Sequence, residues 1–346
     1  MKKQVGEQNG YQIFKQYGVS MAVRSLLMKT VWGSGGTHYE HLGGEQTVKE
    51  MFDPHVITLE KDEELIACAL FCKREVKVNS HTYNSFYTRY FAANPVFRGQ
   101  GIVKQNGAAT MSMIRKDVAE PSLFYAVVEK KNYASKKIVE SVGYNPIALL
   151  KTVGISRYFP KKNSSVRKLS AAELEQMKLR LDVFYKEHGF VQFKPLDTYY
   201  VLEEAGEIVA GVQVEKGSWH IQNMPGVLGF VVMKVVPYIP LLNRIFNPRN
   251  FKFLGLEALY FKDGHAKDAV KLVEHLLAEN KCNSAMLFAD EKSKVYTHLM
   301  KCRLGILNYF SQDADSFLMM AHEHVPADEV ASIQKAPVYV SSFDLL

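Results

Sequence analysis

The chain has 346 residues, with 43 Lys and Arg against 36 Asp and Glu, and 47% of its side chains are hydrophobic. This length exceeds one ordinary hydrophobic core and favours two domains, and the composition excludes a disordered or fibrous chain. The formal net charge of +7 favours an anionic ligand, with a solvated basic surface as the alternative; no basic run interleaved with aromatic residues indicates a nucleic-acid partner.

The amino-terminal residues and the cysteines bear on compartment and metal content. The first seven residues, MKKQVGE, lack the apolar core of a signal peptide, so we expect a cytoplasmic protein. The cysteines form no Cys-x-x-Cys pair, so we expect reduced thiols and no metal. They are Cys68, Cys72, Cys282 and Cys302.

The first part of the chain predicts two helices followed by three strands. The helices are expected over 20–32 and 45–52, joined by a glycine-rich and His-rich segment. A hairpin is expected from 56–60 and 65–76, around the polar turn 61–64. A third strand, rich in Tyr, Phe and Thr, follows over 83–93 and ends before Pro95, which cannot continue a ladder.

A parallel crossover follows this strand. Apolar residues at helical spacing predict a helix that starts close to Gly101, and the apolar run 122–128 predicts a strand covered on both faces. A second helix is expected from Asn132, with Ala134, Ile138 and Val142 on one stripe, to Gly143. Ligands of such units bind at the carboxyl ends of the strands, here where 98–103 meets 129–132.

The turn before the first crossover helix has the composition of a phosphate site. Arg98 supplies a cation, and Gly99 and Gly101 would let a pyrophosphate approach the free amides at the helix start. Taken alone, a short glycine pattern is weak, because a turn between a strand and a helix often needs glycine for steric reasons. The strand, helix and strand around it strengthen the prediction.

Arg98 to Val103 resembles the coenzyme-A motif of the GNAT superfamily of N-acyltransferases, Gln/Arg-x-x-Gly-x-Gly/Ala, except at its last position. Asn132-Tyr133-Ala134 through Gly143-Tyr144 resembles the second motif of that family. The resemblance covers roughly residues 1–155 and implies an α/β fold with a mixed sheet. It also implies acetyl-coenzyme A, or another acyl-coenzyme A, as the donor substrate.

By that resemblance, the backbone at Ala92 and Ala93 would pair with the pantetheine arm, and the Ala93 amide would stabilise the oxyanion. Asn132 would face the arm from the other side, and nearby lysines add positive charge. The pyrophosphate would be held by Arg98 and by the amides of Gly99, Gln100, Gly101, Ile102 and Val103.

The chain also departs from the family pattern. Val103 replaces a small residue, Val139 stands where many relatives have a proton-donating Tyr, and 86–93 has no carboxylate to act as a base. Glu129 is the candidate general base, or else pairs with a neighbouring Lys. Tyr90 and Tyr125 are candidate proton donors, or else core residues. The terminal carboxylate, which some tandem relatives use as a base, is a further option because 338–346 predicts a final strand.

The segment between the predicted first helices would line the acceptor pocket of a GNAT-like fold. Candidates for acceptor recognition are Trp32, His38, Tyr39, His41 and Glu45, with a polar surface loop as the alternative. Arg89 would suit a carboxylate-bearing acceptor, or pair with an acidic neighbour.

The second half repeats the order strand, helix, strand, helix, over 253–261, 265–280, 285–289 and 291–302. Hairpin strands are expected over 198–202, 208–214 and 218–222. The equivalent turn has no Arg, and Asp263 would repel a phosphate. We therefore expect two tandem GNAT-like domains, 1–157 and a degenerate 166–346, joined by a linker over 158–165.

Val227 to Phe246 is the most apolar stretch. Lys234, Pro237 and Pro240 interrupt it, so a spanning helix is not expected and no integral membrane association follows. A buried core segment or an inter-domain loop is the leading interpretation, with peripheral membrane contact as the alternative.

The function expected from the sequence is an acetyl-coenzyme-A-dependent N-acyltransferase that acts on a primary amine of a small molecule or protein. The alternative is a non-catalytic coenzyme-A-binding or partner-binding scaffold of the same fold. A third possibility resembles the tandem aminoacyl transferases of cell-wall synthesis, which use charged tRNA; the coenzyme-A turn argues against it. Monomer and dimer both remain open.

Overall fold

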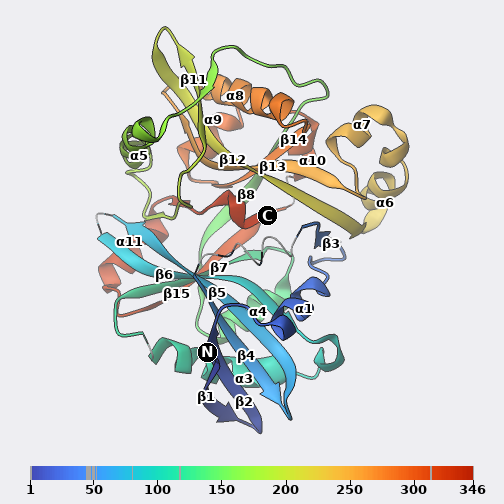
Figure 1. Cartoon of the computed structure of the whole chain (residues 1–346), viewed down its shortest axis with the longest axis vertical. Coiled ribbons are helices and arrows are strands. Elements are labelled where there is room, and N and C mark those ends of the chain that lie inside the picture. The colour runs from blue at the N-terminus through green and yellow to red at the C-terminus, as the bar shows by residue number, and fades with distance from the viewer. Residues whose placement is uncertain are drawn as a thin grey trace. The chain divides into compact units, whose positions relative to one another are not determined.

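The computed structural model describes residues 2–43, 48, 51, 53–79, 81–116, 118–311 and 314–345. They form two compact units, drawn in Figure 1. Unit 1 is built from Met1–Trp32, Gly43–Ala148 and Phe317–Ala331, and unit 2 from Gly33–Leu42, Leu149–Ser316 and Ser332–Leu346. The units interleave along the chain, whereas the sequence predicts consecutive domains; the assignment of 1–157 and 166–346 as domains stays a prediction.

Unit 1 contains a twisted mixed sheet. Its strand order is β1-β2-β4-β5-β6-β7-β15. The strands from β1 to β6 pair antiparallel, and β6 pairs parallel with β7, as the crossover predicts. The strands are β1 (Lys2–Gln8), β2 (Tyr11–Tyr17), β4 (Pro54–Lys61), β5 (Glu64–Val78), β6 (His81–Ala93), β7 (Ser122–Glu129) and β15 (Ser316–Glu323).

Two hairpins of this sheet close through left-handed residues. Asp62 and Glu63, with φ of 51° and 65°, close the predicted hairpin of β4 and β5. Asn9 and Gly10, with φ of 52° and 75°, close the hairpin of β1 and β2, which the sequence analysis did not predict. The Asn-Gly pair is a strong hairpin signal because both residues tolerate positive φ, so this hairpin was recognisable.

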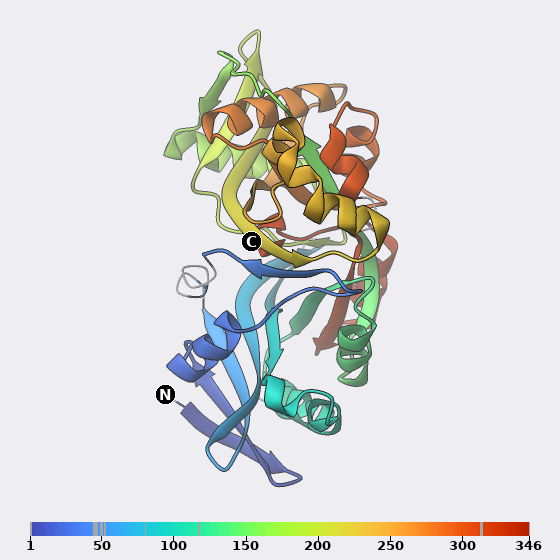
Figure 2. The same cartoon turned by 90° about the vertical axis from the view of Figure 1, so that its right-hand side faces the viewer.

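The helices of unit 1 cover both faces of the sheet (Figure 2). Val23, Leu26 and Leu27 of α1 pack in one cluster with Leu70 and Tyr90. The helices α3 and α4 pack in another cluster, formed on the opposite face because side chains alternate along a strand. The helices are α1 (Met21–Met28), the 3-10 turn η1 (Pro95–Phe97), α3 (Ile102–Lys116), α4 (Tyr133–Ser141) and α11 (Ala327–Lys335), which ends in unit 2.

Unit 2 contains the strand order β8-β14-β13-β12-β11-β9. β13 and β14 pair parallel, while β12 pairs antiparallel with β13 and with β3. β10 pairs with β16. The strands are β3 (His38–His41), β8 (Asn145–Ser156, which begins in unit 1), β9 (Val166–Lys168), β10 (Phe190–Val191), β11 (Tyr199–Glu204), β12 (Glu207–Asn223), β13 (Phe251–Phe261), β14 (Ser284–Asp290) and β16 (Val338–Tyr339).

The helix α8 (Ala266–Glu279) supplies much of the core of unit 2 and buries the apolar stripe that its sequence predicts. That stripe consists of Val270, Val273, Leu276 and Leu277. The other helices are α5 (Ala171–Phe184), α6 (Gly226–Lys234), η2 (Val236–Tyr238), α7 (Pro240–Ile245), α9 (Lys294–Leu299), α10 (Ile306–Ser311) and η3 (Ser342–Leu345).

The structure corrects several predicted elements. The apolar stretch 227–246 is not buried core: it forms α6, η2 and α7, and Val227 and Tyr238 are 83% and 77% exposed. The predicted final strand reduces to two residues of β16, because Ser341 Oγ and Ser342 N both donate to Glu257 Oε2, at 2.8 and 3.1 Å, and the chain then coils into η3. The helix expected over 291–302 spans only α9. On α4, Ala134 is exposed.

Further elements had no counterpart in the sequence analysis, among them α5, α10, α11, β8, β9, β10 and β15. The helix predicted over 45–52 falls largely outside the described residues. Where the structure is described, no helix combines the length and apolar character needed to cross a bilayer.

A bulge in β13 depends on three buried tyrosines. The pairing register with β12 shifts between Gly211–Tyr260 and Gln213–Glu257, and Ala258 inside this shift has a φ of 51°. Its amide donates to Tyr339 Oη at 2.7 Å. Tyr199 Oη donates to the Ala258 carbonyl and Tyr185 Oη to the Leu259 carbonyl, each at 2.7 Å. The phenols therefore satisfy backbone groups that the bulge removes from the ladder.

Replacing Tyr339 with Phe is expected to lower the free energy of unfolding by about 1 to 3 kcal/mol, because the buried Ala258 amide loses its acceptor. Urea denaturation followed by circular dichroism measures the change. Tyr309→Phe is the matched control, since Tyr309 is 74% exposed. Equal midpoints for the two variants would contradict this role of the Tyr339 hydroxyl.

Candidate functional site

The strands β6 and β7 diverge in the middle of the sheet of unit 1. Their parallel ladder joins residues 84–87 to residues 122–125 and ends at the pair Tyr87–Tyr125. β6 continues to Ala93 and β7 to Glu129. From Thr88 onward, the edge of β6 that faces away from β5 therefore lies outside the ladder with β7, and a strand edge is a place where an extended ligand can bind.

A β-bulge lies directly beyond the paired segment. β5 pairs Phe71 with Thr88 and Leu70 with Tyr90, so Arg89 is the extra residue in β6. A bulge bends its strand and increases the local twist, and this one lies where β6 leaves β7. The Arg89 guanidinium lies over the Tyr90 ring, 5.2 Å from its centroid.

Two hydrogen bonds from side chains to the backbone fix the turn that follows β6. Asn94 Oδ1 accepts from the Val96 amide at 3.2 Å, and Gln100 Nε2 donates to the Val96 carbonyl at 3.0 Å. Gly99 and Gly101 have φ values of 79° and 74°, a region that disfavours other residues. A Cβ on Gly99 would meet no atom within 4 Å, and one on Gly101 would meet only Gln105 Nε2, at 3.8 Å, so both glycines border open space.

Arg98 is tied to the end of β6. Its Nε donates to the Ala93 carbonyl at 3.1 Å, while the side chain is exposed. This bond holds the guanidinium beside the glycine turn and leaves its two terminal amino groups available for an anion. The sequence predicted the cation and not its anchor.

The helix α3 begins next to this guanidinium. Its first regular hydrogen bond runs from the Gln105 amide to the Gly101 carbonyl at 3.0 Å, so the amides before Gln105 point out of the helix. The first turn carries no acidic residue that would neutralise the positive end of the helix dipole. Ile102 is buried and Val103 is partly buried, both against the core cluster shared by α3 and β7.

Glu129 and Asn132 lie after β7, on the other side of the divergence. The Asn132 amide donates to the Glu129 carbonyl at 2.8 Å, and Asn132 Oδ1 caps α4 by accepting from the Ser135 amide at 3.0 Å. The side-chain amino group of Asn132 is the part left for a ligand. Glu129 is the partly exposed carboxylate at the carboxyl end of β7.

The two predicted proton donors occupy different places. Tyr90 is 7% exposed and packs against Trp32, with tilted rings whose centroids are 5.1 Å apart, in the cluster under α1. Tyr125 is fully buried in the paired part of the ladder, where its hydroxyl accepts from Arg74 at 3.3 Å. Tyr90 therefore lies beyond the last ladder pair and Tyr125 within it.

The structure also brings together a hydroxyl pair that the sequence analysis missed. Tyr144 Oη lies 3.1 Å from the Thr88 hydroxyl, and Thr88 is the first residue of β6 beyond the ladder with β7. Burial raises the pKa of Tyr144 to about 12, so the phenol is protonated at neutral pH. The sequence marked Tyr144 only as the aromatic end of a motif, and nothing in it paired Tyr144 with Thr88.

The predicted acceptor residues are divided between the units. Trp32 and Arg89 belong to unit 1, whereas His38, Tyr39 and His41 lie on β3, which pairs with β12 in unit 2. There, Tyr39 stacks on Trp219 at 4.8 Å and His41 packs against the same ring at 5.9 Å. Glu45 lies outside the described residues.

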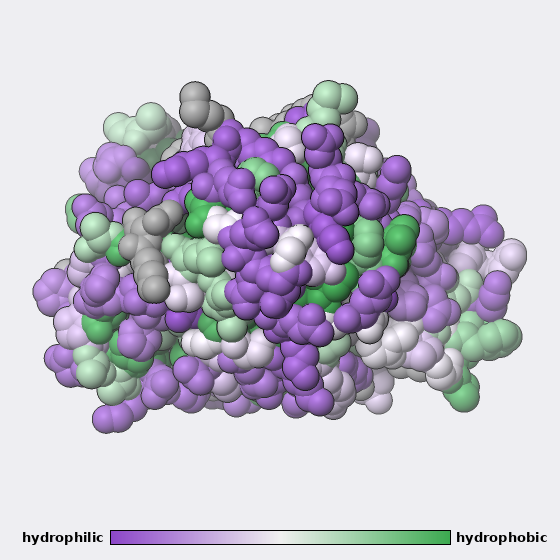
Figure 3. All heavy atoms as spheres, turned by 90° about the horizontal axis from the view of Figure 1, so that it is seen from below, coloured by the Kyte–Doolittle hydropathy of each residue, from purple (hydrophilic) through white to green (hydrophobic). Residues whose placement is uncertain are grey.

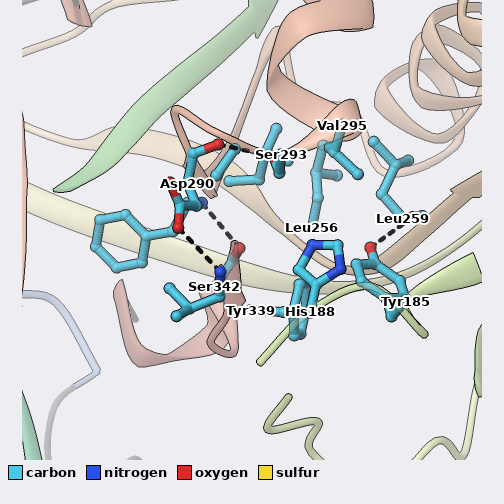
Figure 4. A pocket seen from close by; sticks show the side chains of 13 residues that line it. Tyr185, His188, Leu256, Leu259, Asp290, Ser293, Val295, Tyr339 and Ser342 are labelled. Atoms are coloured by element: carbon cyan, nitrogen blue, oxygen red, sulfur yellow. Dashed lines mark hydrogen bonds between the residues drawn. The ribbon is translucent and has the colours of Figure 1, made fainter. Parts of the chain in front are cut away.

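In unit 2 the parallel strands β13 and β14 also diverge, but there the segment around β16 fills the space between them. The ladder of β13 and β14 ends at the pair Gly255–Met286. The Val338 amide donates to Asp290 Oδ2, and the Phe288 amide donates to Ser342 Oγ, each at 2.9 Å (Figure 4). A cavity of about 10 Å³ remains among these residues, which holds at most a water molecule. The open divergence of unit 1 is therefore the candidate site. The terminal carboxylate of Leu346 lies outside the described residues.

Glu204, His265 and Asp268 also gather in unit 2, with potential ligand atoms within 4.8 Å of one another. Asp268 bonds both His265 Nδ1, at 2.8 Å, and Lys271 Nζ, at 2.7 Å. A local ion-pair network accounts for this cluster.

Comparisons with known proteins identify the fold. No protein-family model and no curated protein sequence matches the chain. Solved structures of Saccharomyces cerevisiae N-myristoyltransferase with bound myristoyl-CoA match it with a TM-score of 0.57 at 10% identity, over 98% of this chain and 87% of theirs. A second structure, which also contains inhibitors, gives a TM-score of 0.57 at 9% identity, over 98% and 88%.

At this identity the similarity shows the fold alone. The chain has the mixed α/β fold of N-myristoyltransferase. The expected α/β fold with a mixed sheet is confirmed, whereas the roles of Arg98 to Val103 and of Asn132 to Tyr144 stay predictions.

Glu257 bonds the segment that fills the divergence of β13 and β14, and it predicts that the stability of the protein depends on pH. Burial raises the pKa of Glu257 from 4.5 to about 7. Between these values the folded protein holds a proton that the unfolded chain releases, so the free energy of unfolding falls as pH rises. Glu257→Gln removes this contribution. Its free energy of unfolding, measured by urea denaturation from pH 4.5 to 8, is expected to fall less with pH than that of the wild type.

His188 contributes the opposite slope, because burial lowers its pKa from 6.5 to about 4. This contribution is common to both proteins and cancels in the difference between wild type and variant. Parallel pH profiles of the two proteins would show that Glu257 does not hold a proton in the folded state.

Proposed function

We propose that unit 1 binds an acyl-coenzyme A in the divergence of β6 and β7 and transfers its acyl group to a primary amine. Three features that follow one another along the chain support the proposal: an edge of β6 outside the ladder with β7, a glycine turn that borders open space, and the start of α3. An extended amide-bearing arm followed by a pyrophosphate matches these features in the same order. The GNAT-like fold supports this assignment.

In this proposal the arm runs along β6. The backbone of Ala92 and Ala93, next to the bulge, offers partners to the pantetheine amides, and the amino group of Asn132 reaches the arm from the side of β7. The pyrophosphate receives the amides of the turn and of the first helical residues together with Arg98. The amides belong to Gly99, Gln100, Gly101, Ile102 and Val103.

The acyl transfer then requires two proton movements. The amine loses a proton to a base, its nitrogen attacks the thioester carbon, and the carbon–sulfur bond breaks to release a thiolate that takes up a proton. Glu129 is the proposed base because it is a partly exposed carboxylate at the carboxyl end of β7. Tyr90 and Tyr125 are the proposed donors, and the Ala93 amide the proposed oxyanion donor.

The acceptor is proposed to be a primary amine of a small molecule or protein. Trp32 and Arg89 lie in unit 1, on the side of the sheet that α1 covers and at the bulge. His38 and His41 remain candidates from β3. The donor is proposed to be acetyl-coenzyme A or a longer acyl-coenzyme A.

A coenzyme-A-binding scaffold without turnover is the second candidate function. It is favoured by Val139, which packs against the α3 core cluster in place of a proton-donating Tyr. Release of free thiol from acyl-coenzyme A in the presence of a panel of amines separates the two functions. Amine-dependent release that falls at least tenfold in Glu129→Gln supports the enzyme, and binding without release supports the scaffold.

The site is tested first by calorimetric titration of acetyl-coenzyme A and a long-chain acyl-coenzyme A. Wild type is expected to bind with micromolar affinity. Arg98→Ala is expected to weaken binding about tenfold, which corresponds to about 1.4 kcal/mol. Gly101→Val is expected to weaken it further, because its side chain fills the space beside the helix amides and strains a positive φ.

Gly206→Val is the control for the strain. Gly206 also has a positive φ of 80°, and a Cβ at this position would meet no atom within 4 Å, but it lies in the β11–β12 turn of unit 2. Equal affinities for wild type, Arg98→Ala and Gly101→Val would place the coenzyme elsewhere. No binding by any folded protein would overturn the proposed function.

A further inference from the structure

The segment from α6 to α7 exposes an unusually apolar surface. Its largest exposed side chains are Val227 at 83%, Tyr238 at 77% and Phe230 at 62%, and Leu241 is 46% exposed. Figure 1 shows α6 and α7 grouped together beyond the end of β12. By contrast, hydrophilic side chains cover most of the face drawn in Figure 3, with smaller hydrophobic groups between them. Several large apolar side chains exposed on neighbouring elements indicate an interaction site.

The exposure is not the result of a loose segment. Val232 of α6, Val236 of η2 and Ile245 of α7 are 5%, 6% and 3% exposed. Ile245 packs with Phe251 and Phe253 of β13 in one core cluster. The helices are therefore anchored by one set of apolar residues and present another set to solvent.

The same segment carries positive charge without negative charge. From Lys216 to Leu256 the chain contains no Asp or Glu. Among the described residues, no acidic side chain lies within ion-pair distance of its lysines and arginines or of the nearby Lys281. The exposed cations are Lys216, Lys234, Arg244, Arg249, Lys252 and Lys281.

Some of these cations line a polar cavity of about 220 Å³ next to α7. Arg244, Lys252 and Lys281 contribute the charge, and four asparagines complete the lining with Ile245 and Cys282. Asn243 Oδ1 is buried there without a hydrogen-bond partner in the described residues. Because a side-chain amide can be turned about its axis, Asn243 can offer either its oxygen or its amino group to a bound polar group.

We propose that this segment docks unit 2 on an anionic phospholipid bilayer, with the apolar side chains of α6 and η2 in the interface and a lipid phosphate in the basic cavity. Apolar residues next to unpaired cations are the two features that interfacial segments combine. The charge favours an anionic occupant, and an anionic bilayer attracts basic segments with about 1 kcal/mol for each Lys or Arg near its surface. This proposal is independent of acyl transfer in unit 1.

The test is sedimentation of the full-length protein with phosphatidylcholine vesicles and with vesicles that contain about one third phosphatidylglycerol. The wild type is expected to bind the anionic vesicles at least tenfold more tightly, and added salt is expected to weaken that binding. The triple variant Arg244→Gln, Lys252→Gln, Lys281→Gln is expected to lose on the order of 100-fold, at about fivefold for each cation.

The apolar contribution is tested separately with Val227→Ser, Phe230→Ser, Tyr238→Ser, which is expected to lose at least tenfold. Leu179→Ser, Val183→Ser is the matched control, because these two side chains of α5 are 67% and 66% exposed in the same unit. All variants should retain the circular dichroism spectrum and the acyl-coenzyme A affinity of the wild type.

Failure of the wild type to bind anionic vesicles, or equal binding by the variants and the control, would overturn the proposal. Concentration-dependent dimerisation in analytical ultracentrifugation, abolished by the apolar triple variant in the absence of vesicle binding, would also overturn it and assign the surface to a second copy of the chain.

Discussion

The early end of the ladder between β6 and β7 is the constraint on which the rest of unit 1 depends. Two parallel strands that stay paired satisfy each other's backbone and leave nothing for a ligand. Here the ladder stops at Tyr87 and Tyr125, and the bulge at Arg89 turns β6 away. Beyond these pairs, β6 continues to Ala93 and β7 to Glu129 outside their common ladder. In the proposed function, a ligand with its own amides binds along this edge of β6.

In unit 2, side chains and a neighbouring segment of the same chain satisfy the backbone and carboxylate groups at the equivalent divergence. β13 also carries a bulge and also separates from its parallel neighbour after two pairs. Three tyrosine hydroxyls satisfy the bulge, and the segment around β16 bonds Asp290 and Glu257. These contacts occupy the space that an extended ligand would need. Both units therefore contain a bulged strand that separates from its parallel neighbour. In unit 2 the chain itself bonds the groups at this place, whereas in unit 1 a ligand is proposed to bind there.

The two units also differ in where they carry positive charge and exposed apolar surface. In unit 1, the positive charge at the divergence comes from one anchored guanidinium and a helix start without acidic neighbours. In unit 2, it comes from exposed cations on a segment free of acids, beside apolar side chains in water. The first arrangement suits a single compact anion that enters a turn. The second suits an extended anionic surface, because its cations are spread over several elements.

The sequence by itself determined many of the local elements and the position of the glycine turn after β6. Apolar periodicity identified β6, α3, β7, α4 and α8, and the glycines and Arg98 marked the turn, because these signals depend only on neighbours along the chain. Only the tertiary structure decided where the ladder ends, that Arg98 bonds Ala93, and that Thr88 meets Tyr144. It also placed β15, from near the end of the chain, in the sheet of unit 1, and left part of the apolar stretch 227–246 exposed. These features arise from contacts between segments that are distant in the sequence. The apolar content of a segment does not by itself specify whether another part of the protein covers that segment.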